Sequence, residues 1–445
     1  MSIRTLAHVS PGRIILFGVF CTILIGALLL ALPQCRTTYI SFMDLLFTAT
    51  SATCVTGLFT VPMSSFTTAG KCVILMLVQI GGLGLITMTL FVMSLFIDMG
   101  MATQLVAGKL LELESWKNIR QFIIFIISLT LGMELFGALC MLPIFLREYS
   151  LLKSLFCSVF YSVSSFCKAG ISLYEGDMLH YSHNIPMLCI IAFLVFSGGF
   201  GFITWHEIMR YFIARKEKKR FVFSLHSKII MYGTAAMIGT FALLFLLLER
   251  TNTLADMSFP LAAINSVFLG TTMRSAGVLT VPFVDLHLAT IFIIMIMAFI
   301  GSAPGSTGSG VKITTFAIFL ATIKAAIIGK TSVEIRGRTI AKDQVFKATA
   351  IVSLGIAWIG FTTLCLLITE NIDFMDLFIE AISGFTNIGI STGITPFLTC
   401  FGKLFIMISM IIGRIGSLTL ILALKWGSKP EMIGFSYPEE RVMLS

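Results

Sequence analysis

The sequence predicts an all-α polytopic membrane protein. Of its 445 residues, 57% are hydrophobic and only 12% are charged, and a water-soluble fold cannot enclose that much apolar surface. Apolar runs long enough to span about 30 Å of hydrocarbon recur along the chain, and a short polar loop ending in glycine occurs four times among them. We therefore predict four repeats of helix, re-entrant pore half-helix and helix in a pseudo-fourfold arrangement, with eight transmembrane spans.

The four loops are similar in sequence and almost evenly spaced. The first runs from Thr50 to Leu58, and its three counterparts end at glycines that follow at intervals of roughly 110 residues, a regularity that indicates repeated architecture. The residues of these loops that we expect to bind an ion are Val55, Thr56, Gly57, Lys168, Ala169, Gly170, Ser275, Ala276, Gly277, Asn387, Ile388 and Gly389.

The first repeat, residues 1–97, starts with an apolar stretch at 14–32. This stretch is long enough to be a transmembrane helix, so we expect no cleavable signal peptide. A segment too short to span follows at 41–52, and its Asp44 suits the positive end of a helix. A second span is predicted at 72–97, after the loop. The second repeat, residues 98–213, has the same order of elements, at 122–146, 151–165 and 185–212.

The third repeat, residues 214–329, has a long helix at 229–248 and a half-helix at 259–271. Its last apolar run starts at His287 and is interrupted near Gly301 by glycines and a proline, through which a helix cannot continue intact. The fourth repeat, residues 330–445, has its elements at 348–369, 376–385 and 402–424.

The distribution of charge indicates the orientation of the chain. Most Lys and Arg residues lie near the two termini and in the linkers around 98–120, 209–228 and 329–347, which the repeats place on one side. By the positive-inside rule that side is the cytoplasm. We therefore expect a multi-pass protein of the cell inner (plasma) membrane with both termini cytoplasmic. The net charge of +9 is then a signal of topology in the lipid bilayer, and we expect no nucleic-acid partner.

The sequence carries no signature of catalytic or metal chemistry. The ten cysteines lie mostly in apolar runs and lack paired or metal-ligand spacing, so we expect neither disulfides nor a metal site. The six histidines fall mostly at span ends or in loops, and the spans contain no paired acids, no His-Glu metal motif and no serine with an activating base. We predict that the protein is not an enzyme and carries no cofactor.

Loops of this kind are suited to ion chemistry. Non-helical backbone at membrane depth must face protein or a water-filled cavity, because each unpaired polar group otherwise costs several kcal/mol. Four such loops around one axis would supply a ring of carbonyl oxygens that can replace the hydration shell of a monovalent cation, and glycine permits the backbone geometry. The glycine-rich stretches 81–84 and 198–201 are instead typical of close packing between helices.

Several motifs carry a family resemblance that covers nearly the whole chain. They are Phe47 to Ser51 running into Val55 to Leu58, Arg274 to Gly277, Ser391 to Pro396 and Tyr437 to Arg441. The sequence resembles the Trk/Ktr/HKT superfamily of potassium transporters, and most closely the Ktr-type membrane subunits. The resemblance implies a single-chain pseudo-tetrameric pore for potassium, a homodimer and a cytosolic ring of nucleotide-binding regulatory subunits. Sodium is a further candidate as a coupling or activating ion.

Basic residues at membrane depth are functional candidates. Lys312 lies in the interrupted run of the third repeat, a region that in related transporters resembles an intramembrane gating loop. Arg414 interrupts the last span, and a cation facing a pore is an electrostatic barrier to another cation. A structural kink or a structural ion pair is the alternative for each. Our hypothesis is a gate formed by Gly305, Ser306, Thr307, Gly308, Gly310, Lys312 and Arg414. Arg274 resembles a residue usual in the third loop of the family, and we expect it to support the filter.

Lys168 departs from the family pattern, which usually has asparagine before the Ala-Gly of the second loop. An ammonium group pointing into the pore would repel potassium, so we expect Lys168 to point away and to anchor carbonyl groups or an acidic partner such as Glu175. The departure leaves a sodium-preferring or weakly selective pathway of the same fold as the alternative function. A carrier built from inverted repeats is disfavoured, because the four repeats cross the membrane in the same direction.

Overall fold

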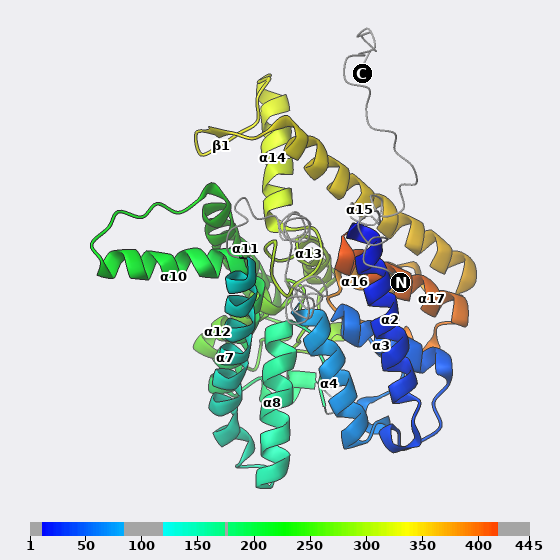
Figure 1. Ribbon diagram of the computed structural model, residues 1–445. Coiled ribbons are helices and arrows are strands. Elements are labelled where there is room, and N and C mark those ends of the chain that lie inside the picture. Colours follow the sequence, from blue (N-terminus) through cyan, green and yellow to red (C-terminus); the bar gives the residue numbers. More distant parts are fainter. Residues whose placement is uncertain (1–10, 84–118, 174–176, 417–445) are drawn as a thin grey trace, which may run out of the picture.

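The structure, a computed structural model, describes residues 11–83, 119–173 and 177–416, which are mainly helical (Figure 1). The helices form four groups along the chain. The first is α2 (Pro11–Leu30), α3 (Phe42–Cys54) and α4 (Thr68–Gly82), and the second is α7 (Ile119–Phe145), α8 (Leu151–Cys167), α9 (Ile185–Gly199) and α10 (Phe202–Lys216). The third is α11 (Leu225–Glu249), α12 (Phe259–Thr272), α13 (Leu288–Phe299) and α14 (Ile313–Ile328), and the fourth is α15 (Lys342–Thr369), α16 (Phe374–Thr386) and α17 (Cys400–Ile415).

Short elements complete these groups. An antiparallel hairpin joins α14 to α15, and Glu334 of β1 (Glu334–Ile335) pairs in it with Thr339 of β2 (Arg338–Thr339). Single turns of 3-10 helix lie at Pro33–Cys35, Met63–Ser65, Asp177–Tyr181, Phe283–Asp285 and Thr395–Phe397. One such turn follows each of the four glycine loops, so the similarity between the groups extends beyond the long helices.

The half-helices α3, α8, α12 and α16 lie where the sequence predicts them. At the start of α3 the hydroxyl of Ser41 accepts a hydrogen bond from the backbone N–H of Asp44 at 3.2 Å, and the carboxylate of Asp44 suits the positive end of the helix. The C-terminal part of α3, residues 47–54, is buried without a gap. The half-helices therefore run from the outside of the molecule into its interior and carry the four loops there.

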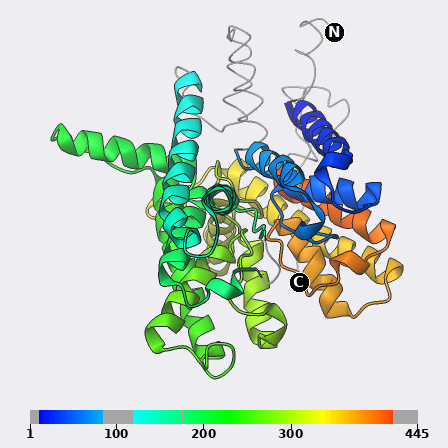
Figure 2. The same cartoon turned by 90° about the horizontal axis from the view of Figure 1, so that it is seen from below.

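The expectation of one continuous helix over 185–212 is wrong. α9 ends at Gly199 and α10 begins at Phe202, with a bend of 99° between them. Gly201 lies in the left-handed region at φ +87°, a conformation that ends a helix and suits glycine. The backbone N–H of Phe202 donates to the carbonyl of Gly305 at 2.7 Å. α10 consequently projects sideways from the body of the molecule (Figure 1, Figure 2).

The predicted interruption in the last apolar run of the third repeat is present. Residues 300–312, between α13 and α14, are not helical and are called here the broken segment. Their N–H groups find acceptors at the end of α9: Ala303 donates to the carbonyl of Gly199 at 3.1 Å, and Thr307 donates to that of Gly198 at 3.0 Å. Backbone groups at the two interruptions thus form hydrogen bonds with each other. This lowers the free-energy cost of non-helical backbone at membrane depth.

Helix length and composition support the membrane character without fixing the number of spans. Among the described residues, three helices are long and apolar enough to cross a bilayer, and the bent pair of α9 and α10 would make a fourth. The ranges expected for the last helices of the first and fourth repeats, 72–97 and 402–424, extend beyond the described residues. Eight spans and the four repeat boundaries therefore stay predictions.

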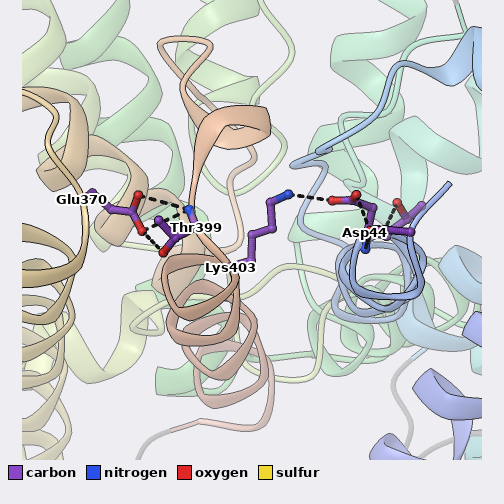
Figure 3. Close-up of polar contacts among 6 residues, drawn as sticks. Asp44, Glu370, Thr399 and Lys403 are labelled. Atoms are coloured by element: carbon purple, nitrogen blue, oxygen red, sulfur yellow. Dashed lines mark hydrogen bonds and ion pairs between the residues drawn. The ribbon is translucent and has the colours of Figure 1, made fainter.

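Polar side chains fix the start of α17 (Figure 3). The first and last groups of helices lie side by side (Figure 1, Figure 2), with α3 packed against α17. Lys403 of α17 forms an ion pair with Asp44 of α3, 2.7 Å from Nζ to Oδ1, and these side chains are only 12% and 18% exposed. Glu370, at the end of α15, accepts hydrogen bonds from the N–H of Thr399 at 3.1 Å and from its hydroxyl at 2.5 Å. Thr399 is the N-cap of α17, so these contacts hold the helix between α15 and α3.

We expect Lys403→Ala to destabilise the protein, because it leaves the largely buried carboxylate of Asp44 without its ion-pair partner. The effect should lie between that of an exposed pair, up to about 1 kcal/mol, and that of a buried one, about 3 to 5 kcal/mol. The midpoint of thermal unfolding in detergent should fall by several degrees. Lys330→Ala removes an exposed ion pair with Glu334 and should leave the midpoint unchanged. Equal midpoints for both variants would contradict the prediction.

Candidate functional site

The four glycine loops share a pattern of positive φ angles. In each loop, the glycine and the residue two positions before it both have positive φ. A residue with a side chain rarely adopts this conformation, because its Cβ crowds the backbone. Its recurrence at one position shows that the four loops are equivalent in structure. The pairs of residues are Val55 and Gly57, Lys168 and Gly170, Ser275 and Gly277, and Asn387 and Gly389.

In three of the loops, the first of the two residues with positive φ ends the half-helix. Val55, Lys168 and Asn387 are the C-caps of α3, α8 and α16, and their N–H groups donate back to the last turn of the helix. In the third loop the cap is Met273 in a right-handed conformation, and the left-handed Ser275 follows it. In all four cases the chain turns sharply from the helix into the loop.

The glycines form a closed ring of contacts with backbone carbonyls. Each glycine lies against the carbonyl oxygen of the residue that precedes the glycine of another loop, so close that a Cβ would collide with it. The contacts, from glycine to carbonyl, are Gly57 to Ala169, Gly170 to Ala276, Gly277 to Ile388, and Gly389 to Thr56. Because the last contact returns to the first loop, the four loops meet around one centre in sequence order.

A cavity of about 700 Å³ opens onto this ring. All four ring glycines line it, together with side chains that follow them in the loops, among them Phe59, Leu173, Leu279 and Ser391. Backbone carbonyls gathered beside an accessible cavity are the ligands with which proteins dehydrate monovalent cations. The site therefore offers hard oxygen ligands.

Hydroxyl groups brace the first two loops, a role that the sequence did not predict for these positions. The hydroxyl of Ser51 accepts a hydrogen bond from the N–H of Gly57 at 3.1 Å, and that of Ser164 accepts one from the N–H of Ile171 at 3.1 Å. Both serines lie at the same distance before the glycine of their loop. Ser383 has this place in the fourth loop, where its hydroxyl makes no hydrogen bond within the described residues. This recurrence is the sequence signal that could have identified the position.

Lys168 is buried, with 2% of its surface exposed. Its Nζ donates to the carbonyl of Arg274 at 2.8 Å and to the hydroxyl of Ser302 at 2.6 Å. It anchors a carbonyl group, as expected, whereas Glu175, the acidic partner considered, lies outside the described residues. Lys168 therefore links the second loop to the third loop and to the broken segment.

The third loop is joined to the broken segment by two further contacts. Arg274, expected to support the filter, is 4% exposed and donates from Nη2 to the carbonyl of Gly301 at 3.4 Å. The hydroxyl of Ser275 accepts a hydrogen bond from the N–H of Ser309 at 2.9 Å. The arginine thus supports the loop through the broken segment.

Arg414 reaches from α17 to the broken segment. Its Nη1 donates to the carbonyl of Thr307 at 2.5 Å and to the hydroxyl of Ser309 at 3.0 Å, and its Nη2 donates to the carbonyl of Gly81 in α4. The hydroxyl of Thr307 donates in turn to the carbonyl of Phe166 in α8, at 2.9 Å. One arginine and one threonine thus connect the broken segment to three helices.

The other candidate gate residues divide into two sets. Lys312 donates from Nζ to the carbonyl of Gly308 at 2.6 Å, and Gly310 has a positive φ of 77°. Gly305 instead contacts the first residue of α10 through its carbonyl, and the hydroxyl of Ser306 donates within the broken segment. The structure therefore brings the Thr307 end of the segment to Arg414 and the Gly305 end to α10.

The described residues hold no arrangement suited to metal or disulfide chemistry. All ten cysteines are free, and no three His, Cys, Asp or Glu side chains in the described ranges are grouped so as to hold a metal ion. The fully buried carboxylates there, Glu249 and Glu380, lie on different helices.

The fold and the ring of loops define a class, that of helical membrane proteins whose glycine loops meet around a common centre. Residues 20–427 match the family model of TrkH, described as a cation transport protein. The chain therefore belongs to the TrkH family of cation transport proteins, and it is a transporter and not an enzyme.

Curated relatives cover nearly the whole chain. The chain is 34% identical to the Ktr system potassium uptake protein B of Bacillus subtilis, over 97% of the chain and 96% of that protein. It is 32% identical to the potassium/sodium uptake protein NtpJ of Enterococcus hirae, over 100% and 99%. The crystal structure of the potassium transporter TrkH from Vibrio parahaemolyticus has the same fold, with a TM-score of 0.69 at 18% identity, over 92% of this chain and 84% of that one. The resemblance inferred from the motifs is confirmed.

Gly57→Ser should reduce cation uptake into proteoliposomes by about tenfold or more, because the left-handed backbone disfavours a side chain there and the carbonyl of Ala169 leaves no room for one. Gly239→Ala, at an α11 position with open space around it, is the control and should transport like the wild type. Both variants should elute as single species in gel filtration. Wild-type uptake by Gly57→Ser would show that the ring does not control the ion path.

Proposed function

We propose that the protein mediates uptake of monovalent cations, mainly potassium, through a single axial pore. The observation that carries the proposal is the closed cycle of glycine–carbonyl contacts, which places one copy of each loop at a common centre. In this proposal the twelve candidate ion-binding residues form a selectivity filter with pseudo-fourfold symmetry. The half-helices aim their partially negative carbonyl ends at its centre.

Potassium is the main ion in this proposal. Two relatives from Bacillus subtilis and Vibrio alginolyticus are named as potassium uptake proteins. The ammonium group of Lys168 is engaged by Arg274 and Ser302, so its hydrogen-bonding capacity is directed at protein groups. A sodium-preferring or weakly selective pathway is the second candidate, because the Enterococcus hirae relative is named for both ions and the lysine departs from the family asparagine. Sodium as a coupling or activating ion belongs to the same alternative.

The broken segment and Arg414 form the gate in this proposal. The guanidinium group holds the segment against α4 through Thr307, Ser309 and Gly81. A cation beside the path of another cation is an electrostatic barrier. Opening then means that these hydrogen bonds are exchanged and that the segment changes course, which its glycines permit.

We propose a homodimer in the cell inner membrane, with both termini in the cytoplasm and a cytosolic ring of nucleotide-binding regulatory subunits. The charge distribution and the family resemblance support this arrangement. The exposed face of α10 supports contact with lipid, because Met209, Phe212 and Ile213 are exposed. Arg210 and Arg215 lie on the same helix, which is bent by 99° from α9. An amphipathic basic helix with this orientation suits the membrane interface.

Tracer flux into liposomes that contain the purified protein tests the ion. We expect rubidium uptake that excess potassium inhibits and excess sodium does not, and we expect Lys168→Asn to keep or raise the rate of uptake. Equal inhibition by both ions, relieved in Lys168→Asn, would favour the second candidate. Complete loss of transport in Lys168→Asn would contradict the role assigned to the lysine.

The gate is tested by Arg414→Ala and by a deletion within 305–310. Each change removes part of the hydrogen-bonded barrier, so basal flux in the same liposomes should rise severalfold and respond less to regulation. Lys324→Ala, on α14 outside the gate, is the control and should behave like the wild type. Wild-type flux and regulation in both gate variants would eliminate this part of the proposal.

A further inference from the structure

We propose that Glu380 is a further specificity-determining residue, whose buried carboxylate sets the affinity of the ring and its cavity for the transported cation. Glu380 lies in the half-helix α16, and its side chain is 0% exposed. The residues proposed above as filter and gate do not include it. This inference rests on the proposed cation pathway and adds to it the group that attracts the ion.

One oxygen of the carboxylate holds the chain that leaves the fourth loop. Oε1 accepts hydrogen bonds from the hydroxyls of Ser391 and Thr395, the latter at 2.7 Å. Ser391 Oγ also accepts a hydrogen bond from the N–H of Gly393 at 2.9 Å and lies 2.9 Å from the hydroxyl oxygen of Thr395. Ser391 lines the cavity at the ring. The carboxylate therefore lies one side chain behind the cavity wall.

The other oxygen, Oε2, is buried and lacks a hydrogen-bond partner within the described part of the chain. None of the ion pairs found there involves Glu380. The two hydroxyl donors on Oε1 favour the ionised form of the carboxylate, because hydrogen bonds to a charged acceptor stabilise the charged form. A buried anion is costly unless a cation is close to it. In this proposal, a transported cation in the neighbouring cavity compensates the negative charge of Glu380.

The contact between Glu380 and Ser391 is called here the clamp, because it holds the chain that leaves the loop. The second loop shows that such a contact does not require a charged residue. Tyr161 occupies the place of Glu380 in α8, and its hydroxyl lies 3.1 Å from that of Ser172, at the same sequence separation as between Glu380 and Ser391. The first and third loops have Thr48 and Phe268 at this position. Since a neutral phenol performs the equivalent contact, the distinguishing property of Glu380 is its negative charge.

Other charged groups near Glu380 are already engaged or lie farther out on the helix. Asp376 precedes Glu380 by one turn of α16 and is partly exposed. On α15, Glu370 binds Thr399, and the remaining charged residues, Lys342, Asp343 and Lys347, lie in the first turns of the helix. On α17, Lys403 binds Asp44, and Arg414 binds the carbonyls of Thr307 and Gly81 and the hydroxyl of Ser309. α13 has no charged residue. A unit charge about 10 Å from a cation, at an effective dielectric constant of about 20, changes its affinity roughly tenfold.

Glu380→Gln keeps the size and an acceptor oxygen of the side chain and removes the charge. We expect the apparent KM for rubidium uptake into proteoliposomes to rise roughly tenfold while the maximal rate changes little. In the wild type the affinity should increase as the external pH is raised, because the carboxylate is then ionised more completely. Glu380→Gln should not show this dependence on pH. Tyr161→Phe and Asp376→Asn, which remove the neutral clamp and the neighbouring charge, are the controls and should change KM less.

An unchanged KM with an unchanged pH profile in Glu380→Gln would overturn the inference. So would a lower maximal rate at constant KM, because it would reduce the residue to a structural clamp. Glu380→Asp preserves the charge and should stay close to the wild type in KM and pH dependence; a tenfold weaker affinity in this variant would also overturn the inference. If the proposed function itself were wrong, the wild-type protein would transport no cation, and this outcome is distinct from those above.

Discussion

The contact between a glycine and the carbonyl of another loop is the constraint on which the rest of the structure depends. At each of the four places, a single Cβ would push two loops apart. The sharp left-handed turns at Val55, Lys168, Ser275 and Asn387 bring the loops to this contact, and the half-helices deliver them to the interior. Strain of about 1 to 3 kcal/mol at each non-glycine turn persists only where the surroundings fix it. All four turn residues are buried, which provides that fixation, and hydroxyl groups brace the first two loops in addition.

The basic side chains near the ring have backbone carbonyls, and not carboxylates, as their main partners. A broken helix exposes carbonyl groups that have lost their N–H partners. Lys168 donates to Arg274, Arg274 to Gly301, and Arg414 to Thr307 and Gly81. None of these three basic residues takes part in an ion pair in the ranges that the structure describes. Backbone carbonyls, and not carboxylates, therefore fix the positions of these three side chains.

The repeated features of the chain could be predicted from the sequence, and so could the break near Gly301, because several glycines and a proline mark it together. The break at Gly201 could not. The half-helices and glycine loops recur, so each copy supports the others. The break at Gly201 occurs once, and its compensating partner, Gly305, lies far away in the sequence. The stretch 198–201 also fits the packing interpretation in part, because Gly198 and Gly199 do lie close to neighbouring atoms. The sequence pattern cannot distinguish packing glycines from a glycine that ends the helix.

Residues that brace the loops were missed for a similar reason. Ser51 and Ser164 are inconspicuous one at a time and become visible only when the loops are aligned on their glycines. Glu380 has no charged counterpart in the other loops, where the same position is Thr48, Tyr161 or Phe268. Its role depends on what lies behind a cavity wall, and that is a property of the folded chain.

The charges of the site suggest how attraction and release are balanced in the proposed pathway. A filter that only attracted cations would retain them, since conduction requires binding that is favourable and yet weak enough to reverse. Carbonyl oxygens and the carboxylate of Glu380 supply attraction beside the cavity. Lys168 and Arg414 supply positive charge at the broken segment, within reach of the same ring. In the proposed pathway, a cation that leaves the ring toward the broken segment would meet repulsion, and movement of that segment would change the repulsion while the proposed filter stays intact.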